Sequence, residues 1–169
     1  EDKILKNVSN KPINNKYFGE GITIFNNKLF QLTWKAQKVL IYKLDGIKFI
    51  ESKNFQTTKK EGWGITHNKD HLIVSDGSEY LHFWNPNYKQ QNTMLPTKKL
   101  KVTYQHKKVT KLNELEFYVD NNNQEYVLAN IWRTNKIAII DLSTGIVKKM
   151  LDFSYLNSLC NNKNKNVLN

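Results

Sequence analysis

The sequence predicts an all-β protein. Short apolar runs rich in Val, Ile, Leu and aromatic residues recur along the chain, separated by turn-forming residues. These runs recur about every 8 to 12 residues, and no segment carries the 3.6-residue apolar stripe of an amphipathic helix. Paired runs joined by short turns are typical of antiparallel sheets.

Three pairs of apolar runs form an internal repeat. The paired runs are 29–34 with 39–42, 72–76 with 80–84, and 126–132 with 137–140. Their onsets lie 43 and 54 residues apart, which is about the spacing of four-stranded propeller blades. The sequence therefore predicts about three propeller blades. A closed ring needs about four to eight blades, so we expect other polypeptide segments to complete the functional unit.

Turn chemistry supports these strands. Asn26-Asn27 separates two apolar runs, and Ser143-Thr144-Gly145 interrupts the last pair. Asp76-Gly77 suits a tight primed turn, so we expect Ser75-Asp76-Gly77-Ser78 to be a hairpin turn and not a nucleophilic site.

Length and composition predict one ordinary domain, and we place its three blades within residues 17–156. The chain has 169 residues, 39% of them hydrophobic, which supports a core. Residues 1–16 read as a polar leader or loop, and residues 157–169 as an Asn- and Lys-rich insertion leading into a closing segment. Cys160 is the sole cysteine, so the chain can form no internal disulfide and no zinc site built on several cysteines.

The net charge of +11 raises the question of nucleic-acid binding. Arg133 is the only arginine, and the lysines are dispersed among many asparagines without forming a stripe. An AT-rich genome accounts for this Lys and Asn bias, so we expect no nucleic-acid partner. No apolar run is long enough to span a membrane.

Six short motifs follow one another along the chain. They are Phe18-Gly19-Glu20-Gly21-Ile22-Thr23, Gln31-Leu32-Thr33-Trp34, Gly62-Trp63-Gly64-Ile65-Thr66, Ser75-Asp76-Gly77-Ser78, Leu112-Asn113-Glu114-Leu115-Glu116 and Ala129-Asn130-Ile131-Trp132. In this order and spacing, residues 17–156 resemble the plant-type and bacterial glutaminyl cyclases. The Lys and Asn bias is similar to that of an apicomplexan, Plasmodium-type member.

The resemblance implies a five-bladed β-propeller that converts an N-terminal glutamine to pyroglutamate with release of ammonia. It implies glutaminyl peptides or proteins as substrates, no cofactor for catalysis, and work in the secretory pathway. Two family elements have no match here, an upstream Phe-Thr-Gln-Gly element and a later Gly-Lys-Leu-Trp-Pro strand. We therefore expect the pocket lysine and the closing blade to come from sequence outside this chain.

The residue types of the motifs suit that chemistry. Glu20, between two small glycines, is the candidate to carry the proton from the substrate amine to the departing amide nitrogen. Asn113 is the candidate hydrogen-bond partner of the substrate amide or its developing oxyanion. The predicted pocket walls are Trp34, Trp63 and Trp132, with Phe18 as a fourth by resemblance. Glu114 either orients Asn113 or accepts backbone hydrogen bonds.

Each assignment has a structural alternative. A glutamate between glycines is often a turn residue in solvent, Asn113 can satisfy its own backbone in a turn, and one tryptophan per repeat is commonly a packing residue, as we expect for Trp84. The alternative function is a non-catalytic propeller that binds peptides or proteins through an aromatic-lined axial face. A carboxylate on the same face as the tryptophans distinguishes the enzyme from the binding module.

The four histidines, at positions 67, 71, 82 and 106, do not predict a zinc centre. His67 and His71 are four residues apart, a spacing that gathers ligands on a helix, whereas this segment reads as strand, turn and strand. A structural cation on the propeller axis stays open at this stage.

Overall fold

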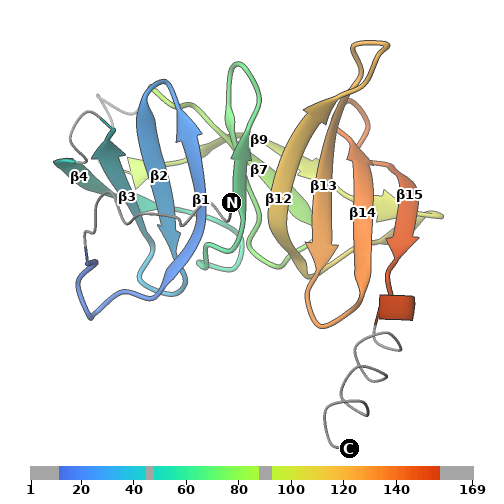
Figure 1. The fold of residues 1–169 in the computed structure, drawn as a ribbon, viewed down its shortest axis with the longest axis horizontal. Coiled ribbons are helices and arrows are strands. Elements are labelled where there is room, and N and C mark those ends of the chain that lie inside the picture. The colour runs from blue at the N-terminus through green and yellow to red at the C-terminus, as the bar shows by residue number, and fades with distance from the viewer. Residues whose placement is uncertain (1–11, 45–47, 88–92, 157–169) are drawn as a thin grey trace, which may run out of the picture.

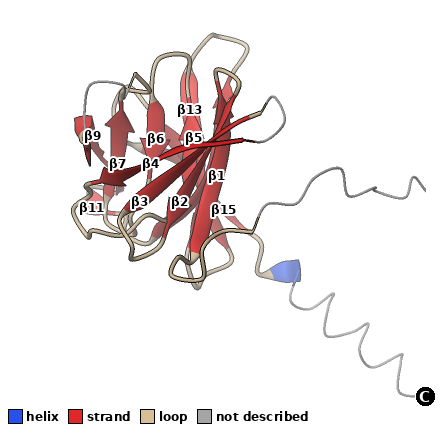
Figure 2. Ribbon diagram, turned by 90° about the vertical axis from the view of Figure 1, so that its left-hand side faces the viewer, coloured by secondary structure: helices blue, strands red, loops and turns tan. Residues whose placement is uncertain are grey.

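The part of the chain that the structure describes folds into three mainly antiparallel sheets that lie side by side (Figure 1). The computed structural model describes residues 12–44, 48–87 and 93–156. Within them, strands and loops account for nearly everything, with one short helical turn at 155–156 (Figure 2). The predicted all-β class is confirmed.

Each sheet is a meander of strands that are mostly consecutive in the chain. The first sheet contains β1 (Gly19–Phe25), β2 (Lys28–Thr33), β3 (Lys38–Lys43) and β4 (Lys48–Phe55), with β8 (Thr93–Met94) parallel to β4. The middle sheet contains β5 (Ile65–His67), β6 (Leu72–Val74), β7 (Tyr80–Trp84) and β9 (Pro96–Lys101). The third sheet contains β12 (Leu112–Val119), β13 (Glu125–Ile131), β14 (Lys136–Asp141) and β15 (Val147–Asp152). A small hairpin, β10 (Thr103–Tyr104) with β11 (Lys107–Lys108), connects the last two sheets.

The three strand pairs of the sequence repeat are the central pairs of these sheets. β2 pairs with β3, β6 with β7, and β13 with β14, all antiparallel. The first strands of the sheets also meet, because β5 contacts both β1 and β12. Among the described residues the first and third sheets share no strand pairing, so the sheets form an open row and not a closed ring.

Two apolar cores separate the sheets. The middle sheet faces both of them, because successive side chains of a strand point to opposite faces. Within β6, Ile73 belongs to the core shared with the third sheet, whereas Leu72 and Val74 belong to the core shared with the first. Trp84 is fully buried in the latter core, 5.5 Å from the Phe55 ring, as expected of a packing residue.

The turns follow the predictions with one exception. Asn26 and Asn27 both have positive φ angles, 46° and 58°, and join β1 to β2 in a two-residue primed turn. Asp76-Gly77 does not form such a turn. Five residues connect β6 to β7, and of the pair only Gly77 has a positive φ angle. The physical reason is that Asp76 is buried and fully engaged in hydrogen bonds, as described below.

The strands run from Gly19 to Asp152, inside the predicted 17–156 domain. The predicted insertion at 157–169, including Cys160, and most of the predicted leader at 1–16 lie outside the described residues. These boundaries stay predictions.

Candidate active site

Backbone hydrogen bonds join the segments that carry the predicted site residues. The Gly21 amide donates to the Trp63 carbonyl at 2.8 Å, which holds β1 against the segment before β5. The Trp34 amide donates to the Phe18 carbonyl at 3.0 Å, and the Gly62 amide donates to the Trp34 carbonyl at 3.0 Å. The entrance of β1, the end of β2 and the entrance of β5 therefore converge on one place.

Asn113 reaches the same place because Gly64 lets β12 approach closely. A Cβ atom at Gly64 would lie only 2.1 Å from the Asn113 carbonyl oxygen, so no larger residue fits without a backbone shift. The buried Ser75 hydroxyl stabilises this contact between Gly64 and Asn113 by hydrogen bonds to both backbones. It accepts a hydrogen bond from the Gly64 amide at 2.9 Å and donates one to the Asn113 carbonyl at 2.7 Å.

Six of the seven predicted site residues line one pocket of about 270 Å³, and they are Phe18, Glu20, Trp34, Trp63, Asn113 and Trp132. Two edge-to-face aromatic pairs form its walls, Phe18 with Trp34 at 6.0 Å and Trp63 with Trp132 at 5.4 Å between ring centroids. The volume lies near the lower end of the range for small-molecule sites, which suits a ligand the size of one amino-acid residue.

Glu20 and Asn113 are the polar groups of this otherwise aromatic pocket. Among the residues that the structure describes, neither the Glu20 carboxylate nor the Asn113 carboxamide has a hydrogen-bond partner. Burial, followed by the negative charges of Glu114 and Glu61, raises the pKa of Glu20 above its usual 4.5. A carboxylate and an amide are thus available to a ligand, and the carboxylate has an increased affinity for a proton.

Glu114 lies outside this lining. It borders a second hollow with residues of β12, β13 and β14, namely Leu115, Glu116, Leu128, Asn130 and Ile137. Partial loss of hydration raises the pKa of Glu114. Glu114 acts on the pocket through its negative charge, which raises the pKa of Glu20. A role in orienting Asn113 stays a prediction.

Glu61 is a residue of the site that the sequence did not single out for a role. Its Oε2 atom accepts hydrogen bonds from the indole Nε1 of Trp34 at 3.1 Å and from the indole Nε1 of Trp63 at 2.9 Å. The only sequence signal was its place immediately before the motif of the resemblance that begins at Gly62. Nothing local could reveal the bond to Trp34, which is 27 residues away.

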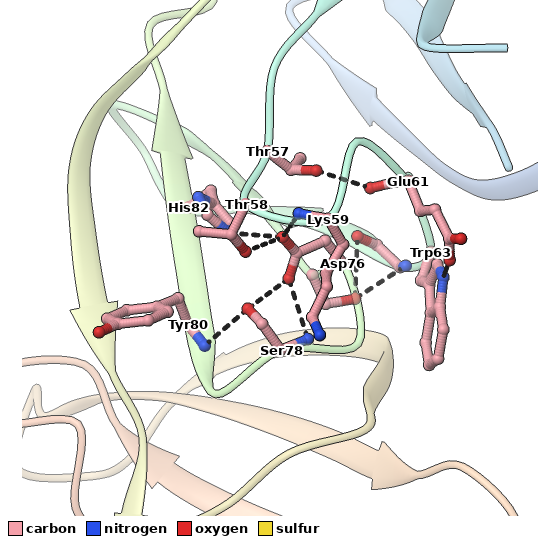
Figure 3. Close-up of polar contacts among 11 residues, drawn as sticks. Thr57, Thr58, Lys59, Glu61, Trp63, Asp76, Ser78, Tyr80 and His82 are labelled. Atoms are coloured by element: carbon pink, nitrogen blue, oxygen red, sulfur yellow. Dashed lines mark hydrogen bonds and ion pairs between the residues drawn. The ribbon is translucent and has the colours of Figure 1, made fainter. Parts of the chain in front are cut away.

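A buried polar network fixes the loop that carries Glu61 and Trp63 (Figure 3). Asp76 accepts hydrogen bonds from the Thr58 hydroxyl, from the Lys59 amide at 3.1 Å and from the Ser78 amide at 3.0 Å, and it contacts His82 Nε2 at 3.2 Å. Burial alone would raise the pKa of Asp76, but the bonds from His82, Ser78 and Thr58 outweigh it and hold the pKa far below its usual value.

Within the described ranges, no group of three or more His, Cys, Asp or Glu side chains is arranged to hold a metal ion. His67 ends β5 and His71 precedes β6, which is the strand, turn and strand expected from the sequence. The same ranges contain no helix with the length and apolar character needed to cross a membrane.

Comparison with known proteins identifies the family. A family model described as glutamine cyclotransferase matches residues 2–169. The chain belongs to the glutamine cyclotransferase family. It is 35% identical over 133 residues to the glutaminyl-peptide cyclotransferase of Arabidopsis thaliana, a match covering 79% of this chain and 38% of that protein.

The fold agrees with this membership. The crystal structure of Myxococcus xanthus glutaminyl cyclase superimposes with a TM-score of 0.70 and 26% identity, over 85% of this chain and 56% of that chain. The chain therefore spans well under two thirds of the length of either cyclotransferase relative.

Proposed function

We propose that this chain carries the glutamine-binding and catalytic residues of a glutaminyl-peptide cyclotransferase. The enzyme would convert the N-terminal glutamine of a peptide or protein to pyroglutamate and release ammonia. Family membership supports the reaction class. The observation that carries the proposal is a carboxylate, Glu20, and a carboxamide, Asn113, without partners among the described residues in a pocket whose other walls are aromatic.

The proposed reaction needs one proton to move. The substrate's α-amine nitrogen attacks its own γ-carbonyl carbon, the carbonyl bond opens to an oxyanion, and the five-membered ring closes. The carbonyl then re-forms while the bond to the amide nitrogen breaks. Glu20 takes the proton that the amine loses and gives it to the departing nitrogen, which leaves as ammonia and not as an amide anion. Because the nucleophile belongs to the substrate, orientation supplies much of the acceleration.

The environment of Glu20 supports this role. A carboxyl with an ordinary pKa is a weak base toward an amine whose own pKa is near 7.7. Burial and the neighbouring carboxylates raise the pKa of Glu20, which narrows that difference and improves proton transfer in both directions. The carboxylate charge also attracts the substrate as its ammonium form, which must first release one proton to solvent, so that the neutral amine attacks and the shuttled proton is the second one that this nitrogen loses.

Asn113 and the aromatic walls have separate tasks in the proposal. The Asn113 amide group donates a hydrogen bond to the substrate's γ-carbonyl oxygen as negative charge develops there, and losing one such donor typically costs about 3 kcal/mol of transition-state stabilisation. Trp34, Trp63, Trp132 and Phe18 pack against the aliphatic part of the glutamine side chain and exclude water.

The remaining elements of the proposal concern the whole protein. We propose that the three sheets belong to a five-bladed propeller completed by further segments, in keeping with the 56% coverage of the solved cyclase. We further propose a place in the secretory pathway, which fractionation of cells expressing the full-length protein would test, with cytosolic residence as the contrary result. The apicomplexan origin stays a prediction.

Ammonia release from a glutaminyl dipeptide tests the function directly. We expect the full-length protein to release one ammonia per peptide, with a product lighter by one NH3 in mass spectrometry. A dipeptide that begins with asparagine is the matched control, because its shorter side chain cannot close the same ring. Tight binding of the glutaminyl peptide without turnover would instead support a non-catalytic propeller.

A further inference from the structure

Glu61 connects two walls of the aromatic pocket without lining it. Trp34 follows β2 in the first sheet, and Trp63 precedes β5 in the middle sheet. Both indole N–H groups donate to the same carboxylate oxygen of Glu61, at 3.1 and 2.9 Å. One oxygen atom therefore ties together two rings that belong to different sheets.

The loop that carries Glu61 is itself held in place. The Thr57 hydroxyl donates to the Glu61 carbonyl at 3.0 Å, and the Lys59 amide donates to buried Asp76 at 3.1 Å (Figure 3). Asp76 is 1% exposed, so this anchor is shielded from water. The backbone at Glu61 is thus already held in place, so its carboxylate can orient the two indole rings without the entropic cost of ordering the loop.

We infer that Glu61 is a positioning residue, which sets the orientation of the Trp34 and Trp63 rings against the bound substrate and touches no reacting atom. The inference rests on the proposed function for the identity of that substrate. An indole has a single polar atom, an N–H that can only donate, so an acceptor determines where its ring lies. An ionised acceptor makes the stronger hydrogen bond.

Glu61 also acts on Glu20 through its charge. Three influences raise the pKa of Glu20, and in decreasing order they are burial, the Glu114 charge and the Glu61 charge. The Lys35 ammonium lies 4.0 Å from the Trp34 ring centroid, so a positive charge also lies at this wall. Removing the Glu61 charge alone should therefore lower the pKa of Glu20 and leave the burial and Glu114 contributions in place.

The first test uses the indole N–H cross-peaks in a ¹H–¹⁵N spectrum of the full-length protein, assigned with single Trp→Phe variants. We expect Glu61→Leu to shift the peaks of Trp34 and Trp63. The peak of Trp84, whose buried Nε1 has no hydrogen-bond partner among the residues that the structure describes, should stay in place. Glu116→Leu, a change at an exposed glutamate of β12, is the matched control and should move neither pocket peak.

The second test separates binding from chemistry. Glu61→Leu should raise KM for a glutaminyl dipeptide by about tenfold or more, the loss expected for a charge-assisted hydrogen bond, with kcat changed less than about threefold. Glu61→Gln keeps an oxygen that can accept both indole bonds, so KM should stay within about threefold of wild type. Its kcat/KM should instead persist to lower pH, because the pKa of Glu20 falls.

Two results would overturn the inference. One is a folded Glu61→Leu protein whose Trp34 and Trp63 peaks match wild type, and the other is a KM no higher than that of Glu116→Leu. If Glu61→Leu does not fold, the spectrum of Glu61→Gln decides: loss of the ionised acceptor must shift the peaks of Trp34 and Trp63 together, and a shift of only one peak or of neither refutes a shared acceptor. Lack of turnover in the wild type would refute the proposed function, whereas the spectra would still judge Glu61.

Discussion

Replacing Gly64 with alanine should damage the site more than it damages the fold. The new Cβ would lie 2.1 Å from the Asn113 carbonyl oxygen and 2.8 Å from the Glu114 Cα. Ordinary contact begins at 3.4 Å, so the first distance is 1.3 Å too short, and both obstacles are backbone atoms that cannot rotate away. β12 must therefore move away from the segment before β5 and carry Asn113 with it.

The magnitude follows from that displacement. A shift of about 1 Å at a catalytic group can cost about 100-fold in rate, so kcat/KM for a glutaminyl dipeptide should fall by about that factor. Overpacking of this kind typically costs about 1–3 kcal/mol in the free energy of unfolding. Thermal unfolding followed by circular dichroism measures the second effect, and ammonia release at a temperature well below the transition measures the first.

Gly145→Ala is the matched control. There the Cβ would also lie 2.1 Å from a backbone oxygen, that of Lys101, and Gly145 has a φ angle of 75° that alanine rarely adopts. The position is not part of the pocket. We expect a comparable or larger loss of stability with kcat/KM close to wild type. Equal losses of kcat/KM in the two variants would refute the argument that Gly64 acts through Asn113.

Four further outcomes are expected. Glu20→Gln should lower kcat by at least about 100-fold in a folded protein, because the amide cannot carry a proton; retention of more than about a tenth of wild-type kcat would move the shuttle elsewhere. The acidic limb of wild-type kcat/KM should have its midpoint above 4.5, since Glu20 must be ionised to act and its pKa is raised. Trp63→Ala should raise KM by removing a wall, as initial-rate measurements can show. Asp76→Asn should cost about 3 kcal/mol at pH 7 in urea unfolding. The pKa of Asp76 is lowered on folding, so its contribution is complete above about pH 4 and is lost as the pH falls further, and the gap to wild type should narrow in acid.

The sequence predicted the parts of the fold that local pattern controls. The paired apolar runs and the turn signals within 29–42, 72–84 and 126–140 correspond to the central strand pairs of the three sheets. The five-residue connection after β6 was not predicted. Its conformation depends on Asp76 reaching Thr58 and His82, and contacts of a buried carboxylate with distant residues leave no local signal.

The sequence predicted which residues line the pocket, but not the contacts that bring them together. Ordered motifs named the pocket residues from Phe18 to Trp132, although no periodicity explains why residues so far apart meet. The structure supplies the cause, which is close backbone contact around Gly64 and the shared acceptor at Glu61. Both features involve pairs of residues that lie far apart in the sequence, and no short motif contains both members of such a pair.

The proposed reaction makes two demands on Glu20 that the pocket has to reconcile. The carboxylate must be ionised to receive an ammonium substrate, and it must then hold a proton long enough to return it to the leaving nitrogen. An ordinary carboxyl meets the first demand but releases the proton too readily for the second. Burial raises the pKa of Glu20, and the charges of Glu114 and Glu61 raise it further. The ionised carboxylates of Glu114 and Glu61 thus help Glu20 to hold the proton, and their negative charge offsets the cost to the first demand because it also strengthens the attraction of the cationic substrate.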